Sequence, residues 1–163
     1  MRDVSIEVAA RRIAKRLKKL PVSVEELCAL FDIRLYFTDL KHFDAYYMTL
    51  HGRRLIAVND KLIKTRQRFS IAHEFAHAYL NHGPIAFSSS ASRPTWQERE
   101  ANHFAAELLM PKPLLVQHGY LTPEDIAELC NVSRHAARIR AEELGWRQRE
   151  LGFTSADHKM ETE

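Results

Sequence analysis

The sequence contains few cysteines, which can cross-link a chain, and few glycines, which interrupt regular secondary structure. Of its 163 residues two are cysteines, Cys28 and Cys130, and five are glycines. Two distant cysteines without CxxC spacing argue against a disulfide framework and predict a reducing compartment, the cytoplasm. No apolar run approaches the roughly 18 residues that a membrane span needs. The charged start "MRDVSIEVAARRIAKRLKKL" also lacks the apolar stretch of a secretory signal, so we expect no membrane partner.

What is present is the composition of an ordinary globular domain. Apolar residues make up 45% of the chain and charged residues 28%, so a disordered or fibrous class is excluded. A chain of this length can bury a real core as one domain. The net charge of +3 permits an acidic partner but does not require one.

Hydrophobic periodicity predicts a mainly helical chain with a small sheet. Strand-forming runs occupy 33–38, 45–50 and 55–58, and Gly52 lies in a turn between the last two. Apolar spacing and capping signals predict helices over 6–20, 23–31, 65–80, 95–110 and 133–144, with another that starts near 122. We therefore predict an α+β fold with an antiparallel sheet of about three strands.

The same signals divide the chain into three parts. Residues 1–120 would form the main domain, and residues 121–150 a helix-turn-helix-like extension packed on it. Residues 151–163 would be a disordered tail. The stretch "SSSASRP" (88–94) is predicted to be a mobile loop.

The stretch "RFSIAHEFAHAYLNH" (68–82) contains two histidines four residues apart. Residues i and i+4 of a helix differ by about 40° around the axis and about 6 Å along it, so His73 and His77 can place ring nitrogens on one metal ion. Glu74 lies about 100° further round and can act as a base on a water at that metal. The alternative is an ordinary buried helix face. We favour the metal, because two histidines among apolar residues need partners for their ring nitrogens.

A catalytic zinc ion normally takes three protein ligands, and the helix "TWQEREANHFAAELLMP" (95–111) offers candidates for the third. These candidates are Glu98, Glu100, His103 and Glu107. A helical wheel places Glu98 in the buried stripe and the other three at or beyond its polar edge. A buried carboxylate is costly unless it meets an ionic partner, so we favour Glu98 as a ligand over its other possible role, a cap with Thr95. Glu100 is the fallback.

Three further roles remain open at this point. Asn102, one turn beyond Glu98, is predicted to accept the free ring N–H of a ligand histidine. The strand at 55–58 could offer an edge to a substrate. An oxyanion donor should exist, but we assign none of its possible candidates, which are Tyr46, Tyr47, Tyr79 and His82.

Together, "RQRFSIAHEFAHAYLNH" and "EREANHFAAELLMP" resemble the ImmA/IrrE family of metallopeptidases, over roughly Ile33 to Met110. The resemblance implies a zincin-like domain in which His73, His77 and Glu98 hold zinc and Glu74 is the general base. It also implies a protein substrate: a separate XRE-type helix-turn-helix repressor, whose cleavage or inactivation derepresses genes of a phage, mobile element or stress response. Manganese would also suit a site of two histidines and one carboxylate.

The segment "LTPEDIAELCNVSRHAARIRAEELG" (121–145) predicts a helix, a short turn and a second helix. Its Arg134, Arg138 and Arg140 could face phosphates, as in a helix-turn-helix. The acidic pair Glu142 and Glu143 weakens that basic face. The alternative function is therefore a non-proteolytic module that binds a repressor or DNA, with direct DNA binding the less favoured form.

Overall fold

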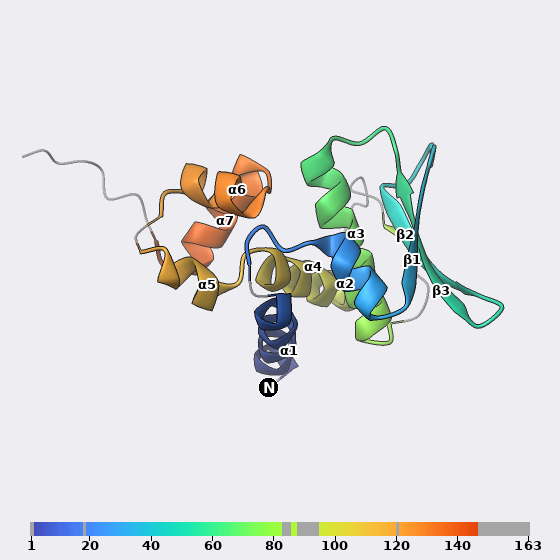
Figure 1. The fold of residues 1–163 in the computed structure, drawn as a ribbon, viewed down its shortest axis with the longest axis horizontal. Helices are drawn as coiled ribbons and strands as arrows, with labels where there is room; N and C mark the ends of the chain where they lie inside the picture. Colours follow the sequence, from blue (N-terminus) through green and yellow to red (C-terminus); the bar gives the residue numbers. More distant parts are fainter. Residues whose placement is uncertain (1, 18, 83–85, 88–94, 120, 147–163) are drawn as a thin grey trace, which may run out of the picture.

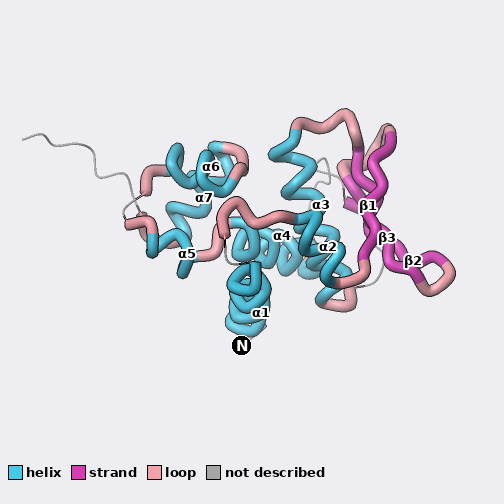
Figure 2. Tube along the Cα trace, viewed as in Figure 1, coloured by secondary structure: helices cyan, strands magenta, loops and turns pink. Residues whose placement is uncertain are grey.

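The computed structural model describes residues 2–17, 19–82, 86–87, 95–119 and 121–146. Its elements are α1 (Arg2–Leu17), α2 (Val24–Leu30), β1 (Ile33–Thr38), β2 (Ala45–Leu50), β3 (Arg53–Asn59), α3 (Lys64–Tyr79), β4 (Ala86–Phe87), α4 (Trp96–Leu109), α5 (Lys112–Gln117), α6 (Pro123–Cys130) and α7 (Arg134–Glu143). The strands gather at one end and helices make up the rest (Figure 2), which confirms the predicted α+β class. No helix in these ranges is long and apolar enough to cross a membrane. The loop predicted at 88–94 and the tail at 151–163 lie outside them.

The sheet is mixed, and the prediction that it would be antiparallel throughout was wrong. Its strand order is β1-β3-β2-β4. β2 and β3 form the expected antiparallel hairpin, with His51 and Gly52 at positive φ in its turn. β3 lies between β2 and β1, and it runs parallel to β1. The two-residue β4 adds a fourth strand that is too short to carry an alternating pattern.

β3 lies inside the sheet because its middle is apolar on both faces. Ile56, Ala57 and Val58 are all buried, which suits a strand with neighbours on both sides. The prediction that 55–58 offers an edge for substrate pairing was therefore wrong.

α3 is the central helix of the molecule. It packs on β2 and β3 on one side and on α4 on the other, and α1 packs on α4 in turn (Figure 1). Its buried residues occupy every position from Ser70 to Ala78, as expected for a helix enclosed on several sides. The helix begins at Lys64, one residue before the predicted start, and the preceding Ile63 makes no side-chain cap.

The helices α6 and α7 lie at the end of the molecule opposite the sheet (Figure 1). Arg140 of α7 is 2% exposed and its Nη2 lies 2.5 Å from Glu107 Oε1. Glu107 is 1% exposed and also pairs with Arg11 of α1 at 3.0 Å. Two sequence predictions were therefore wrong: Glu107 is not at a polar edge, and Arg140 cannot face phosphates. Both were misplaced because a buried ion pair joins helices that are distant in sequence.

Candidate metal centre

Three of the predicted ligands meet at the interface of α3 and α4. The Nε2 atoms of His73 and His77 lie 3.0 Å apart, and neither residue is exposed to solvent. Glu98 Oε2 lies 3.1 Å from His73 Nε2, and Glu98 Oε1 lies 3.2 Å from His77 Nε2. The helical spacing of the two histidines and the buried stripe of α4 thus bring together one cluster of three donor groups.

The cap and the cluster use different atoms of Glu98. The Thr95 hydroxyl accepts a hydrogen bond from the Glu98 backbone N–H at 3.2 Å, which caps α4. The Glu98 carboxylate is left to face the histidines. Its contact with the His73 ring lowers the pKa of Glu98, so the carboxylate is charged at neutral pH.

The ring nitrogens of the two histidines suit a cation. His73 Nδ1 lies 3.0 Å from Asn102 Oδ1, so this nitrogen carries the proton and Nε2 keeps its lone pair. Burial, followed by the neighbouring His73, lowers the pKa of His77 to about 4 and keeps that ring neutral. Two imidazole lone pairs and a carboxylate then converge, and the buried Glu98 Oε1 has no hydrogen-bond partner among the described residues. These residues fit a divalent metal ion of the zinc type.

Glu74 lies beside the cluster with one oxygen anchored and one unpaired. Its Oε2 accepts a hydrogen bond from the Tyr47 backbone N–H of β2 at 2.7 Å. Its Oε1 is buried and accepts none from the residues that the structure describes. Burial raises the pKa of Glu74 to about 8, an effect that the Tyr47 amide opposes, and a cation held by the neighbouring cluster would lower this pKa and favour the carboxylate. The strand therefore orients a carboxylate whose other oxygen is available for proton transfer.

Glu100, the fallback ligand, does not join the cluster. Its Oε2 lies 3.1 Å from Nε2 of His82, and Nδ1 of His82 lies 3.1 Å from Nδ1 of His77. The sequence reasoning missed this link between His82 and His77. The available signal was Asn81, a residue that tolerates the left-handed conformation in which a helix often ends.

Of the candidate oxyanion donors, Tyr47 makes a hydrogen bond elsewhere, and the ring of Tyr79 packs among other aromatic rings. The Tyr47 hydroxyl lies 3.2 Å from Thr49 Oγ1. The Tyr79 ring stacks on Phe75, with the centroids 6.0 Å apart, and packs against Phe104 at 5.4 Å. These contacts give both rings structural roles.

A second group of possible ligands consists of Glu7, His103 and Glu107. It differs from the first group because Arg11 and Arg140 already neutralise Glu107. A metal ion there would lie beside two guanidinium groups. This group is therefore an ion-pair network that joins α1, α4 and α7.

A family model named Peptidase_M78, described as the IrrE N-terminal-like domain, matches residues 28–142. The chain belongs to this family. The matched range includes the HExxH helix, the helix that carries Glu98, and most of the C-terminal helix pair. The IrrE-like membership makes the chain a domain of the metallopeptidase type, in agreement with the predicted resemblance.

Two individual proteins are similar to this IrrE-like chain. An "Uncharacterized immunity region protein 2" of Bacillus phage phi105 is 27% identical over 141 residues, which are 83% of this chain and 88% of that protein. A solved structure titled "Mycobacterium tuberculosis transcriptional regulator" has a TM-score of 0.61 at 16% identity. It matches 90% of this chain, but the chain spans only 48% of that protein, so the likeness concerns the fold alone.

Proposed function

We propose that this IrrE-like chain is a zinc-dependent endopeptidase. His73, His77 and Glu98 would hold the ion, and Glu74 would be the general base. The observation that carries the proposal is the convergence of three lone-pair donors beside an unpaired, buried Glu74 oxygen. A buried set of this kind is costly without a cation between its members.

The chemistry divides between the ion and the chain. Zinc bound there would polarise a peptide carbonyl and lower the pKa of a water molecule to about 7. Glu74 Oε1 accepts the proton of the attacking water and then donates it to the leaving amine. The Tyr47 N–H holds the other oxygen throughout, so the carboxylate keeps its orientation. Asn102 holds the ring of His73.

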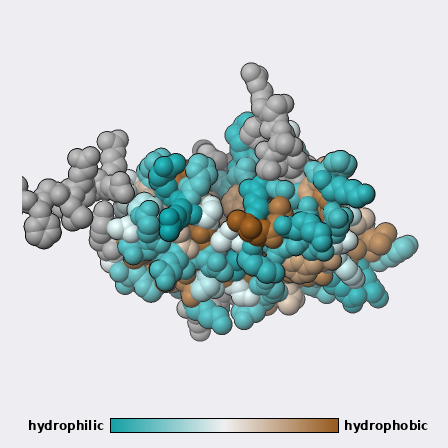
Figure 3. Space-filling view, turned by 90° about the horizontal axis from the view of Figure 1, so that it is seen from above, coloured by the Kyte–Doolittle hydropathy of each residue, from teal (hydrophilic) through white to brown (hydrophobic). Residues whose placement is uncertain are grey.

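A polypeptide substrate is supported by a groove behind His73, on the side of its ring that faces Asn102. The groove has a volume of about 480 Å³ and lies between α3, α4 and α7. It shares Asn102 and Phe69 with the surroundings of His73, since Asn102 bonds that ring and Phe69 lies 6.3 Å from its centroid. Its other apolar lining includes Ile139, and Figure 3 shows apolar side chains amid hydrophilic ones on the molecule's upper face. Such a groove suits an apolar segment of an unfolded or extended chain.

We further propose that the substrate is a helix-turn-helix repressor. The support is family membership together with a phage relative that is named for an immunity region. The test incubates the purified protein with the repressor encoded beside its gene, with zinc and with a chelator. A repressor fragment that forms only with zinc is the expected result. A Glu74→Gln variant should bind zinc and repressor but form no fragment, and cleavage by this variant would contradict the assignment of the base.

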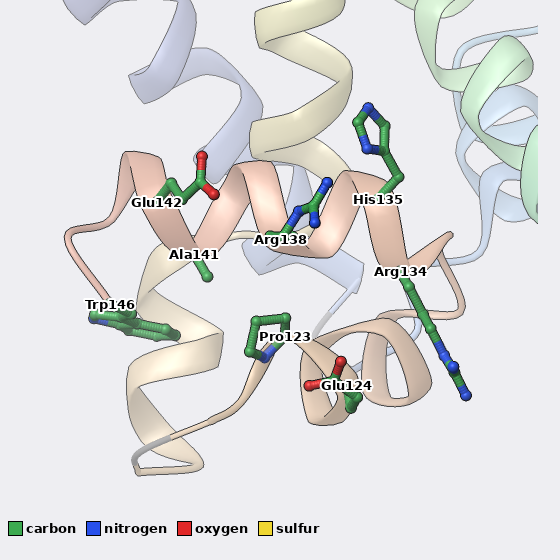
Figure 4. Close-up of a pocket in the computed structure, with 8 residues that line it drawn as sticks. All are labelled: Pro123, Glu124, Arg134, His135, Arg138, Ala141, Glu142 and Trp146. Carbon is green, nitrogen blue, oxygen red and sulfur yellow. The ribbon is translucent and has the colours of Figure 1, made fainter. Parts of the chain in front are cut away.

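A repressor-binding or DNA-binding module remains the second candidate, because α6 and α7 are two helices joined by a short turn, and Arg134 and Arg138 are exposed. Figure 4 shows the hollow between the two helices, about 760 Å³ in volume, with Arg134 and Arg138 at its wall. Glu124 and Glu142 line the same hollow, so its charge is mixed. DNA binding that falls steeply with salt and survives removal of the metal would favour this module.

A further inference from the structure

His82 and Glu100 form a hydrogen-bonded pair directly behind His77. The Nδ1 atoms of His82 and His77 lie 3.1 Å apart, and His82 Nε2 lies 3.1 Å from Glu100 Oε2. The His82 side chain is 4% exposed and that of Glu100 is 17% exposed. The other nitrogen of the His77 ring, Nε2, faces Glu98. A continuous line of polar contacts therefore runs from the metal cluster through His77 to Glu100.

The end of α3 places His82 beside His77. Asn81 adopts a left-handed conformation with φ 54°, and the His82 backbone N–H donates to the His77 carbonyl at 3.0 Å. This is a Schellman ending, in which the residues brought together normally make an apolar contact. Here two imidazole rings meet, with their centroids 5.1 Å apart.

The first turn of α4 holds His82 from the other side. The ring of Trp96 packs edge-on against that of His82, with the centroids 5.4 Å apart. The amide of Gln97 donates to the His82 carbonyl at 3.4 Å. This turn therefore supplies Glu98 to the metal cluster and Glu100 to the back of His77.

The order of the contacts sets the position of each proton. A neutral imidazole has one N–H and one lone pair. The Glu100 carboxylate accepts from His82 Nε2–H, so Nδ1 of His82 is an acceptor. It accepts the Nδ1–H of His77 and leaves the lone pair of His77 on Nε2, the atom that faces the cluster.

We propose that His82, supported by Glu100, is a positioning residue that holds His77 in the tautomer and orientation of a metal ligand. The inference rests on the metal centre of the proposed function. His82 then does for His77 what Asn102 does for His73, with an added negative charge that increases the basicity of the ligand.

The test measures zinc affinity by competition with a chromophoric chelator, and metal geometry by the visible spectrum of the Co²⁺-loaded protein. His82→Phe fills the same space without an acceptor, and we expect about 10- to 100-fold weaker zinc binding and an altered cobalt spectrum. His82→Asn keeps an acceptor, because its amide oxygen lies as many bonds from the backbone as Nδ1, but it loses the link to Glu100. It should therefore bind zinc about as Glu100→Gln does, and more tightly than His82→Phe. His103→Phe is the matched control, since His103 lies on α4 like Glu100 but pairs with Glu7 of α1 at 3.5 Å and lies outside the line.

Glu100→Gln provides a second variant that leaves His82 in place. It should weaken zinc binding in the parent protein but have no further effect in the His82→Phe protein, because Glu100 acts through His82. Parent affinity and parent spectrum in His82→Phe, or equal losses in His82→Phe and His82→Asn, would overturn the inference. If His82→Phe does not fold, parent affinity in Glu100→Gln overturns it.

The two proposals fail in different ways. A parent protein that binds no zinc would overturn the metal centre and this inference with it. A parent protein that binds zinc but cuts no repressor would overturn the peptidase function alone, and the affinity series would still decide the role of His82.

Discussion

Cys28 and Cys130 are 1% and 0% exposed, and burial raises the pKa of each thiol to about 12. Because the thiolate is the reactive form, we expect both to react slowly with iodoacetamide in the folded protein, even at pH 8.5. Addition of denaturant should expose both thiols and restore the ordinary rise of rate with pH. Mass spectrometry of labelling time courses checks this. Fast native labelling that increases between pH 7 and pH 9 would contradict it.

Ile139 is 43% exposed and lines the groove behind His73. If the groove holds an apolar part of the substrate, Ile139→Asp should lower kcat/KM for repressor cleavage about tenfold, equivalent to about 1.4 kcal/mol. Zinc affinity should not change, because Ile139 contacts none of the ligands. Val116→Asp is the control, since Val116 is 53% exposed on α5 and does not line the groove. Equal effects of the two substitutions would count against binding in the groove.

The sequence alone was enough to predict the three donor groups that the structure brings together, but not the contacts behind them. His73, His77 and Glu98 follow from the period of the helix, since each lies on the buried face of its own element. The role of His82 depends on the way that α3 ends and on the first turn of α4, and neither follows from the pattern of one helix. The position of Asn102 could be predicted because it lies one turn of α4 beyond Glu98. Its contact with His73 agrees with that prediction.

At the level of secondary structure elements, α7 is joined to α4 by a buried ion pair. Arg140→Met would remove one partner and leave the buried Glu107 with Arg11 alone. Removal of one partner of a buried pair costs about 3–5 kcal/mol, so we expect a loss of this order in the free energy of unfolding. Arg138→Met, on the exposed side of the same helix, should change it by less than about 0.5 kcal/mol. Urea denaturation measures both, and equal effects would contradict the role of the pair.

This ion pair also explains why a helical wheel of α4 placed Glu107 at its polar edge although the residue is buried. The wheel treats one helix in isolation, and on it Glu107 falls at the polar edge. Its partners come from α1 and α7, which are 96 and 33 residues away in sequence (Arg11 and Arg140). The prediction of the sheet was wrong for a similar reason. Strand propensity identifies β1, β2 and β3 but does not give their order. The central place of β3 follows only when β1 is paired to its free side.

On the scale of the whole molecule, α3 and α4 form the interface that zinc would join. A ligand that binds only the folded state stabilises it by about 2.7 kcal/mol when its free concentration is 100 times its Kd. For a chain of this size that corresponds to a rise in Tm of about 5–10 °C. We expect this rise on adding zinc to the metal-free protein, and its reversal by a chelator, in differential scanning calorimetry.

The variants separate stabilisation by the metal from catalysis. Glu74→Gln keeps all three donor groups, so zinc should raise its Tm as much as that of the parent protein, although cleavage is lost. His77→Ala removes one of the three donors and should lose most of the rise. If zinc stabilised His77→Ala as much as the parent protein, the ion would bind elsewhere, and the interface of α3 and α4 would not be the metal centre.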